Sequence, residues 1–305
     1  MNLARPTTKR IIVIERPARL RLEKLQLCVG IDGEPERTVP VEDIGVLVLD
    51  HAQTALTVPL LAYLAEQEVA VVVCNAKHLP VAAFLPFAAH HQHALIARKQ
   101  AEAGEPTKKR IWQQIVVAKI SAQADALEKV GVDGSKVRAL AKRVRSGDAD
   151  NVEGLAAVRY FPLMFGEGFL RDTEQPGTNG MLNYGYALIR AAVARAVCGA
   201  GLYPAFGVHH HNRYDPYALA DDLMEPLRPI VDLRVKAFLA VSEVGDRLGP
   251  PEKRWMHPVL TVSCRFDDKR YPVLTALELY AAMVRRALLG EARRVVCPTD
   301  FAWED

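Results

Sequence analysis

Three consecutive histidines, at positions 209–211, stand shortly before an acidic segment that contains Asp222 and Glu225. Asp215 followed by Pro216 is typical of an N-cap and a first helical residue, so we expect a helix from there to Glu225. Residues three apart share one helix face, which places the carboxylates of Asp222 and Glu225 together. Mg²⁺ or Mn²⁺ with a nearby imidazole would neutralise their mutual repulsion. The segment predicts a metal site, although an acidic face in solvent beside a histidine-containing loop is the alternative.

Glu153 is the second candidate, near the start of a helix predicted over 150–165. Asp150 with Glu153 three residues later matches a capping box, which would limit Glu153 to starting that helix. The residues alone leave both roles open. His90, His91 and His93 have no carboxylates near them in the sequence, so we leave them out of the predicted site.

Several enzyme classes are disfavoured by missing motifs. A zinc hydrolase with an H-x-H-x-D signature would need an acid at the position of Arg213. The zincin, P-loop, dinucleotide-binding and α/β-hydrolase signatures are absent. The five cysteines are an odd number, widely spaced and without a C-x-x-C pair, so we expect no disulfide framework and no thiolate zinc site.

The elements that position these residues differ between the two parts of the chain. Short β-branched or alternating runs predict strands at 11–15, 19–22 and 25–30. A strand, helix, strand passage follows at 44–49, 60–66 and 69–74, with Thr57 and Pro59 at the helix start. After Pro86, amphipathic stretches predict helices at 87–103, 107–130, 135–145, 150–165 and 179–198.

These patterns predict an α+β protein of two domains. The first is a small β-rich N-terminal domain, 1–86, and the second a larger all-α catalytic domain, 87–305. The first 17 residues contain an apolar run of only four, far shorter than a signal-peptide core or the ~18 residues of a membrane span. We therefore expect a cytoplasmic protein that does not contact membranes.

Charge is distributed unevenly along the chain. The formal net charge is only +3, yet segment 107–147 holds ten basic and three acidic residues. Such a segment is either a solvated helical face or a surface that contacts phosphates, and composition alone does not distinguish them.

In order along the chain, the motifs resemble one family, the CRISPR-associated spacer-integration nuclease in its short, type II-like (II-C) form. The resemblance covers almost the whole chain. Its landmarks are Glu42 to Gly45, Lys77 to Pro80, Glu153-Gly154 with Arg159 to Phe161, Asn183 to Tyr186, and Ala220 to Pro226.

The resemblance implies the members of the site. The metal ligands would be Glu153, His210 and Glu225, with Asp222 an auxiliary acid and Mg²⁺ or Mn²⁺ the ion. Counting three residues from Gly207 selects His210, although its two neighbouring histidines remain alternatives.

The resemblance also implies the reaction and the partners. A 3′-hydroxyl would attack a phosphodiester of the repeat array, and water in its place would make the same site an endonuclease. Partners would be double-stranded DNA (protospacer and repeat array), a second copy in a homodimer formed by the N-terminal domain, and a small ferredoxin-like adaptation subunit bridging two dimers. The residues expected to contact DNA are Arg159, Arg190, Arg213, Arg228, Lys142 and Arg143.

Two other functions remain open at this stage. One is a DNA scaffold of the same fold that binds no metal, although all three candidate positions hold side chains able to coordinate. The other is a DNA-repair nuclease outside any CRISPR system, which the residues do not exclude and which the neighbouring genes would decide.

Overall fold

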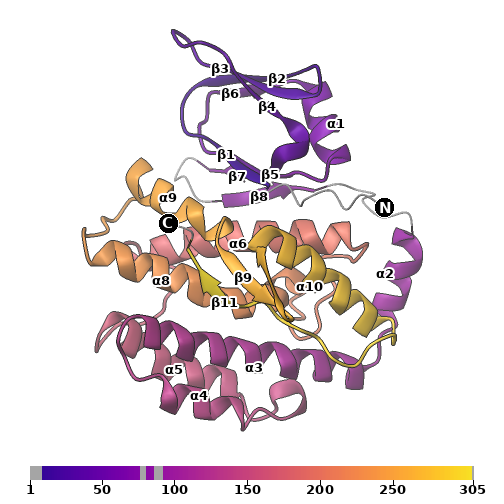
Figure 1. Ribbon diagram of the computed structural model, residues 1–305, viewed down its shortest axis with the longest axis vertical. Helices are drawn as coiled ribbons and strands as arrows, with labels where there is room; N and C mark the ends of the chain where they lie inside the picture. Colours follow the sequence, from indigo (N-terminus) through magenta and orange to yellow (C-terminus); the bar gives the residue numbers. More distant parts are fainter. Residues whose placement is uncertain (1–8, 76–79, 86–91, 304–305) are drawn as a thin grey trace.

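The N-terminal part contains two four-stranded sheets, one above the other in the view of Figure 1. This computed structural model describes residues 9–75, 80–85 and 92–303. The lower sheet has the order β1-β5-β7-β8, with bounds Arg10–Ile14, Ile44–Leu49, Ala70–Cys74 and Pro80–Phe84. The upper sheet has the order β4-β3-β2-β6, with bounds Arg37–Pro40, Gln26–Gly30, Ala18–Glu23 and Thr54–Leu56. A short turn, η1 (Val41–Asp43), precedes β5, and α1 (Val58–Glu66) connects β6 to β7.

The lower sheet contains one strand, β5, that is buried on both faces. Its strands β1, β5 and β7 pair in parallel, and β5 is a continuous apolar run, as expected for a strand covered on two sides. Leu47 belongs to the core formed with the upper sheet and α1. Val46 and Val48 belong to the core formed with the C-terminal helices. This sheet therefore joins the two parts of the chain through its alternating side chains.

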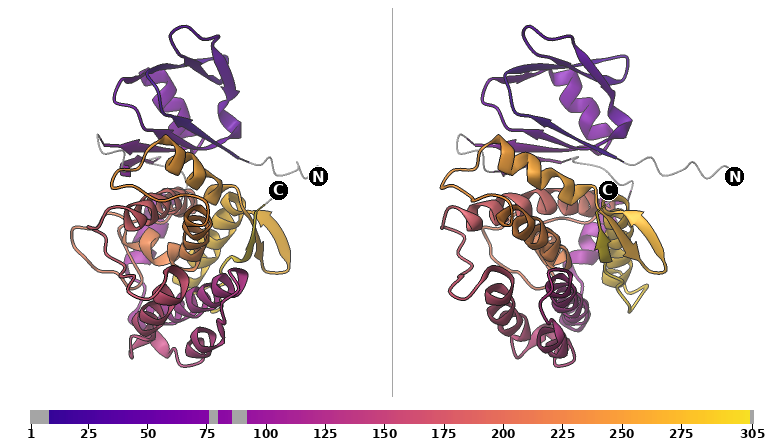
Figure 2. Two further views of the ribbon diagram at one scale, coloured as in Figure 1. Left: turned by 90° about the vertical axis from the view of Figure 1, so that its left-hand side faces the viewer. Right: turned by 60° about the vertical axis from the view of Figure 1, so that its left-hand side comes forward.

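The C-terminal part, seen from two further sides in Figure 2, is built around α6 (Thr178–Gly199). Most residues of α6 are buried. The neighbouring helices are α2 (His93–Ala101), α3 (Glu105–Lys129), α4 (Ser135–Ala141), α5 (Val152–Phe165), α7 (Ala218–Met224), α8 (Arg228–Leu239), α9 (Pro250–Met256) and α10 (Val273–Leu288). The short turns are η2 (Ser146–Asp148), η3 (Glu225–Leu227) and η4 (His257–Leu260). In Figure 1, α3 and α5 lie far from the N-terminal sheets, so the predicted site residue Glu153 belongs to the helical part.

The prediction of an all-α second part is wrong. An antiparallel sheet of order β10-β9-β11 lies there, with bounds Lys269–Pro272, Ser263–Phe266 and Thr299–Ala302. Its signal was local: Cys264 and Phe266 are buried around exposed Arg265, and the turn at Asp267 has a positive φ of 55°. The predicted boundary at 86/87 falls outside the described residues, so the division into domains 1–86 and 87–305 stays a prediction.

Most predicted elements are confirmed, with ends shifted by a few residues. Thr57 is the N-cap of α1 with Pro59 in the first turn. The helix predicted over 135–145 ends earlier, at Ala141. All five cysteines are free. None of the helices in the described part of the chain is long and apolar enough to span a bilayer.

A buried ion pair links the two parts. Lys253 of α9 donates to Asp50, directly after β5, over 2.6 Å, and Lys253 is 1% exposed. Lys253→Met removes this pair and leaves Asp50 a buried carboxylate, so we expect the free energy of unfolding to fall by about 3 kcal/mol. Urea unfolding would measure this, with Lys269→Met on exposed β10 as the control. Equal stability of the two variants would contradict the assignment.

Candidate metal centre

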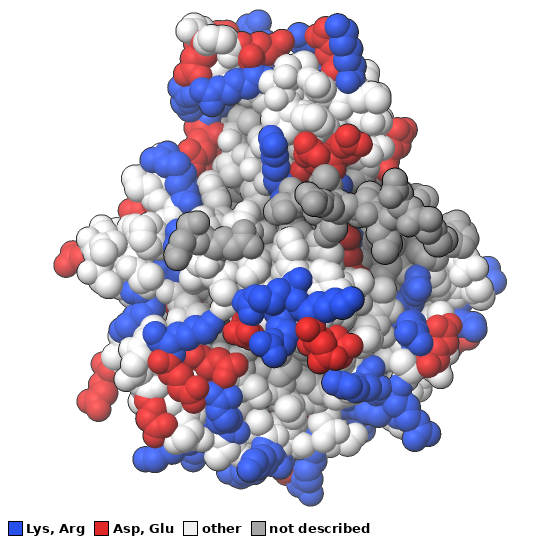
Figure 3. All heavy atoms as spheres, in the orientation of Figure 1, with Lys and Arg blue, Asp and Glu red and all other residues white. Residues whose placement is uncertain are grey.

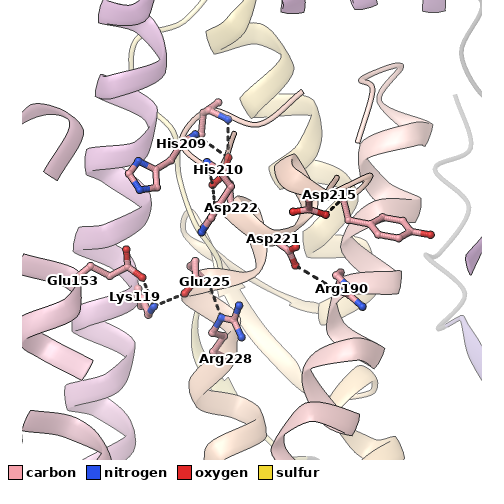
Figure 4. Close-up of polar contacts among 12 residues, drawn as sticks. Lys119, Glu153, Arg190, His209, His210, Asp215, Asp221, Asp222, Glu225 and Arg228 are labelled. Atoms are coloured by element: carbon pink, nitrogen blue, oxygen red, sulfur yellow. Dashed lines mark hydrogen bonds and ion pairs between the residues drawn. The ribbon is translucent and has the colours of Figure 1, made fainter. Parts of the chain in front are cut away.

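Glu153 enters the site from the first turn of α5 (Figure 4). The turn is capped by Asn151, whose side chain accepts from the Gly154 amide over 3.2 Å. Asp148, just before it, accepts from the amides of Val152 and Glu153, each over 3.0 Å. Because other residues satisfy the helix start, the Glu153 carboxylate is available for contacts outside its own helix.

The capping-box reading of Asp150 and Glu153 is therefore wrong. Asp150 lies before the N-cap and pairs with exposed Arg145 instead, over 2.6 and 2.7 Å. The chain at Asn151 has a positive φ of 50°, which moves the helix start one residue beyond Asp150.

Asp222 holds the histidine loop, residues 207–210, in place. Its carboxylate, fully buried, accepts from the amides of Val208, His209 and His210 over 2.6, 3.0 and 3.2 Å. It also lies 2.6 Å from His210 Nδ1, and this hydrogen bond raises the pKa of His210. At Gly207 a Cβ would lie 2.4 Å from the His210 carbonyl oxygen, so only glycine fits the start of this loop.

The prediction that a helix begins at Asp215 and Pro216 is wrong. Asp215 accepts from the Tyr217 amide in a local turn, and α7 begins only at Ala218. The helical path does not stop at the next proline either, because η3 and α8 follow directly. As Figure 4 shows, Asp222 points to the histidine loop whereas Glu225 points toward α3, so the two acids have different partners.

Glu225 and Glu153 converge on one cation, the ammonium of Lys119 in α3 (Figure 4). Lys119 Nζ lies 2.5 Å from Glu153 Oε1 and forms an ion pair with Glu225 Oε2. On its other oxygen, Glu225 accepts from Arg228 Nε over 2.8 Å. Two carboxylates and two cations thus form a compact group with no net charge.

Mutual attraction keeps this group ionised despite its burial. Burial would raise the pKa of Glu225, but Arg228 and Lys119 outweigh it and hold that pKa below its usual range. Burial would also lower the pKa of Lys119, but Glu225 and Glu153 outweigh it and raise that pKa. The pKa shifts of Glu225 and Lys119 thus both favour the charged forms of these two side chains.

This donor set fits a hard divalent cation. Carboxylate oxygens suit Mg²⁺ and Mn²⁺, and an imidazole suits the softer of the two. Glu225 Oε2 is buried and accepts no hydrogen bond of normal geometry, although the Lys119 ammonium lies beside it. That oxygen and Glu153 Oε1 therefore share one cation position, which Lys119 occupies.

Of the three histidines, His210 has the geometry of a ligand. His209 stacks flat on the Trp112 ring, with centroids 4.1 Å apart, and burial lowers its pKa. His210 directs Nδ1 at buried Asp222, an arrangement that fixes the ring and orients Nε2 for coordination. His211 lies exposed after the loop. The contact with Asp222 distinguishes His210 from its neighbours, and its role as a ligand stays a prediction.

A different group brings potential ligand atoms closer together. In the described residues, the set whose ligand atoms all lie within 4.8 Å of one another is Glu23, Cys28 and Glu36, which excludes the three predicted ligands. Arg21 pairs with both of those glutamates on the surface of the upper sheet. Arg21 thus already engages both carboxylates of this set, which lies in the N-terminal part, away from Glu153, His210 and Glu225.

An open pocket of about 570 Å³ adjoins the centre and is lined by His210 and three arginines. Two of these, Arg190 and Arg228, were predicted to contact DNA, and Arg190 lies 3.9 Å from Asp221. The third, Arg171, was not predicted; it pairs with Asn179 and Asn183 of α6. Glu174 and Asp221 also line the pocket, so its three guanidinium groups exceed its acids by one, a balance that suits phosphates.

The other predicted DNA contacts lie outside this pocket. These remaining residues are Arg159, Arg213, Lys142 and Arg143, and all four side chains are exposed. In the basic segment 107–147, Arg138 pairs with Asp125 and Glu128. On the face in Figure 3, blue and red side chains are intermixed over the helical part rather than separated. Arg145 of the segment pairs with Asp150 outside it, so part of the charge excess is balanced within the fold.

Asp232 holds the wall of the pocket. Tyr160 and Tyr186 both donate to its carboxylate, and the Arg228 guanidinium lies over the Tyr186 ring, 4.7 Å from its centroid. Burial raises the pKa of Asp232 to about 6, although both hydroxyls oppose the rise.

The pKa of Asp232 predicts a pH dependence. Because the folded-state value is raised from 3.8 to about 6, ionisation costs folding free energy as pH rises through that window. Asp232→Asn carries no such cost. We expect its stability relative to wild type to increase by about 2 kcal/mol between about pH 4 and pH 7. Urea unfolding at both pH values measures this, and an unchanged difference would contradict it.

Comparison with known proteins gives one family. The protein family described as "CRISPR associated protein Cas1" matches residues 11–246 of this chain. A CRISPR-associated endonuclease Cas1 of Neisseria meningitidis serogroup C is 37% identical over 273 residues, covering 89% of each chain. A casposase bound to integration product has a similar fold, with a TM-score of 0.78 at 20% identity over 94% of this chain and 92% of the other. A Cas6-RT-Cas1–Cas2 complex has a TM-score of 0.73 at 18% identity, over 94% of this chain and 36% of the other.

Proposed function

This chain belongs to the Cas1 family of CRISPR-associated proteins, and from that premise we propose that it is a metal-dependent DNA integrase and endonuclease. It inserts new spacers into a CRISPR array by 3′-hydroxyl attack on a phosphodiester. The observation that carries the proposal is the convergence of Glu153 and Glu225 on one cation position, beside an oriented His210 and an arginine-lined pocket. The relative from Neisseria is named an endonuclease, which supports the same chemistry.

Each residue of the proposed site has a different role. Glu153, His210 and Glu225 would hold Mg²⁺ or Mn²⁺, which supplies Lewis acidity toward the phosphoryl oxygens and the attacking hydroxyl. Asp222 would not bind the ion itself. It fixes the His210 ring and the loop backbone. Arg228 holds Glu225 from the side of the pocket.

The pocket positions the substrate. Arg171, Arg190 and Arg228 place three guanidinium groups around a space that also contains His210. Guanidinium groups bind phosphate oxygens through paired hydrogen bonds, so a DNA strand lying there would have its backbone held beside the metal. Contacts of this kind fix the position of DNA without reading its sequence.

Assembly is part of the proposal. The Cas1 segment in the Cas6-RT-Cas1–Cas2 complex supports a partner subunit for this chain. We propose a homodimer formed through the N-terminal part and a small ferredoxin-like adaptation subunit that bridges two dimers. Its DNA substrates are a protospacer and the repeat array, and it acts in the cytoplasm.

Strand transfer tests this function. A short duplex with 3′-hydroxyl ends is incubated with supercoiled plasmid carrying a repeat array, the purified chain, its partner subunit and Mn²⁺. We expect joined product on a gel, and its loss on addition of a chelator. Product that persists with the chelator would contradict metal dependence. A chain inert with both Mg²⁺ and Mn²⁺, yet still bound to DNA, would instead favour the scaffold.

A further inference from the structure

Lys119 lies between Glu153 and Glu225, the two carboxylates proposed to hold the divalent ion (Figure 4). We propose that its ammonium is an internal counter-cation of the metal centre, which must leave both carboxylates before the ion binds. Lys119 thereby sets the affinity of the centre for divalent ions. The inference rests on the proposed metal-dependent function and adds a residue to it.

The position of Lys119 is unusual for a lysine. It is 8% exposed and belongs to a helix whose neighbouring positions, Ile115, Val116 and Ile120, are fully buried. A buried ammonium loses much of its hydration, and this loss must be offset by close anions. Here the anions are the two glutamates predicted as metal ligands, one from α5 and one from η3.

Lys119 is the cation that links the two ligands. Arg228 also contacts Glu225, but it uses the other oxygen, Oε1. Lys119 pairs with Oε2 of Glu225 and with Oε1 of Glu153 at the same time. Without a cation between them, the two carboxylates would repel each other. The lysine therefore holds the ligand pair together in a metal-free protein.

The ammonium and a divalent ion compete for the same oxygens. An ion bound to Glu153 Oε1 and Glu225 Oε2 would lie roughly 2.1 Å from each of them. The ammonium lies 2.5 Å from that oxygen of Glu153, so the two cations would almost touch. Their repulsion in a buried site is large. Binding of the ion thus requires the lysine side chain to move away.

The competition predicts tighter metal binding when the lysine is removed. Lys119→Met keeps the length and apolar stem of the side chain but has no charge. We expect its Kd for Mn²⁺ to be at least about tenfold lower than that of wild type. Lys269→Met removes one charge from exposed β10 and should leave Kd unchanged. Lys119→Arg keeps the charge and should not bind Mn²⁺ more tightly than wild type.

Titration of the full chain with Mn²⁺ alone, followed by the electron paramagnetic resonance signal of the free ion, measures these values. Thermal melting gives an independent readout. Without metal, Lys119→Met should melt at lower temperature than Lys269→Met, because the glutamates then repel. Saturating Mn²⁺ should raise its melting temperature more than that of wild type.

A crystal structure with Mn²⁺ bound, located by anomalous scattering, gives the direct answer. We expect Lys119 Nζ to have left both carboxylates. An ion bound by Glu153 and Glu225 with Lys119 still between them would overturn the inference, and so would equal Kd values for wild type and Lys119→Met. If neither protein binds Mn²⁺, the proposed metal centre fails as well. If Lys119→Met binds while wild type does not, the lysine is confirmed as the competitor.

Discussion

Replacing Glu225 or His210 with alanine is expected to slow strand transfer at least about a thousandfold, the equivalent of roughly 4 kcal/mol of transition-state stabilisation. Both residues are proposed to supply ligand atoms at the centre. Glu225 is also the residue that joins Lys119 and Arg228, so its loss leaves two cations facing each other. Single-turnover strand transfer with Mn²⁺ and the partner subunit measures the effect.

Two controls separate chemistry from folding in these variants. Both proteins should still bind a 3′-hydroxyl duplex in a gel-shift assay, because the arginines of the pocket remain. His209→Ala removes the neighbouring imidazole, which stacks on Trp112 rather than facing Asp222, and should retain most activity. If His209→Ala is inactive and His210→Ala is active, the assignment of the ligand is wrong. If both glutamate and histidine variants integrate normally, the site itself is wrong.

Asp222→Asn is expected to have the second largest effect, a loss of strand transfer of about a hundredfold and of stability by about 4 kcal/mol. Its carboxylate accepts three backbone hydrogen bonds and faces His210 Nδ1. An amide has only one acceptor oxygen, and its NH₂ group would face N–H donors in a fully buried position. The histidine loop should therefore loosen even though no ligand atom is removed.

Urea unfolding and single-turnover strand transfer together test Asp222. Asp268→Asn, at an exposed position in the β9–β10 turn, is the matched control and should behave as wild type. Asp222→Asn should also need more Mn²⁺ to reach its maximal rate, because the His210 ring is no longer fixed. Unchanged stability would show that Asp222 does not hold the loop. Unchanged Mn²⁺ dependence would show that it does not orient the ligand.

Helices and strands were predicted best where a pattern of apolar residues extends over many positions. The helix predicted over 107–130 is α3, and the run of apolar residues at 44–49 is the doubly buried strand β5. Strands of three or four residues such as β6 and β11 gave no such signal. The capping of α5 was misassigned because Asp148 and Asp150 are equally suited by type, and only the backbone turn at Asn151 distinguishes them.

Only part of the site could be predicted from the sequence. Glu153, His210 and Glu225 follow from the family motifs, but their shared partner Lys119 does not. In the sequence, Lys119 is distinguished only as one of the ten basic residues of segment 107–147. Its distinguishing signal was a charged residue between Val116 and Ile120, on the buried side of an amphipathic helix. Its role depends on contacts with Glu153 and Glu225, 34 and 106 positions away, which helical periodicity does not encode.

The central claim is that a divalent ion at Glu153, His210 and Glu225 acts on the phosphodiester attacked by the 3′-hydroxyl. The most direct measurement is strand transfer into a target with sulfur in place of one non-bridging oxygen at that phosphate. Mg²⁺ binds sulfur poorly and Mn²⁺ accepts softer ligands. We predict that one of the two diastereomers reacts slowly with Mg²⁺ and recovers with Mn²⁺. Equal slowing of both diastereomers with both ions would contradict the account.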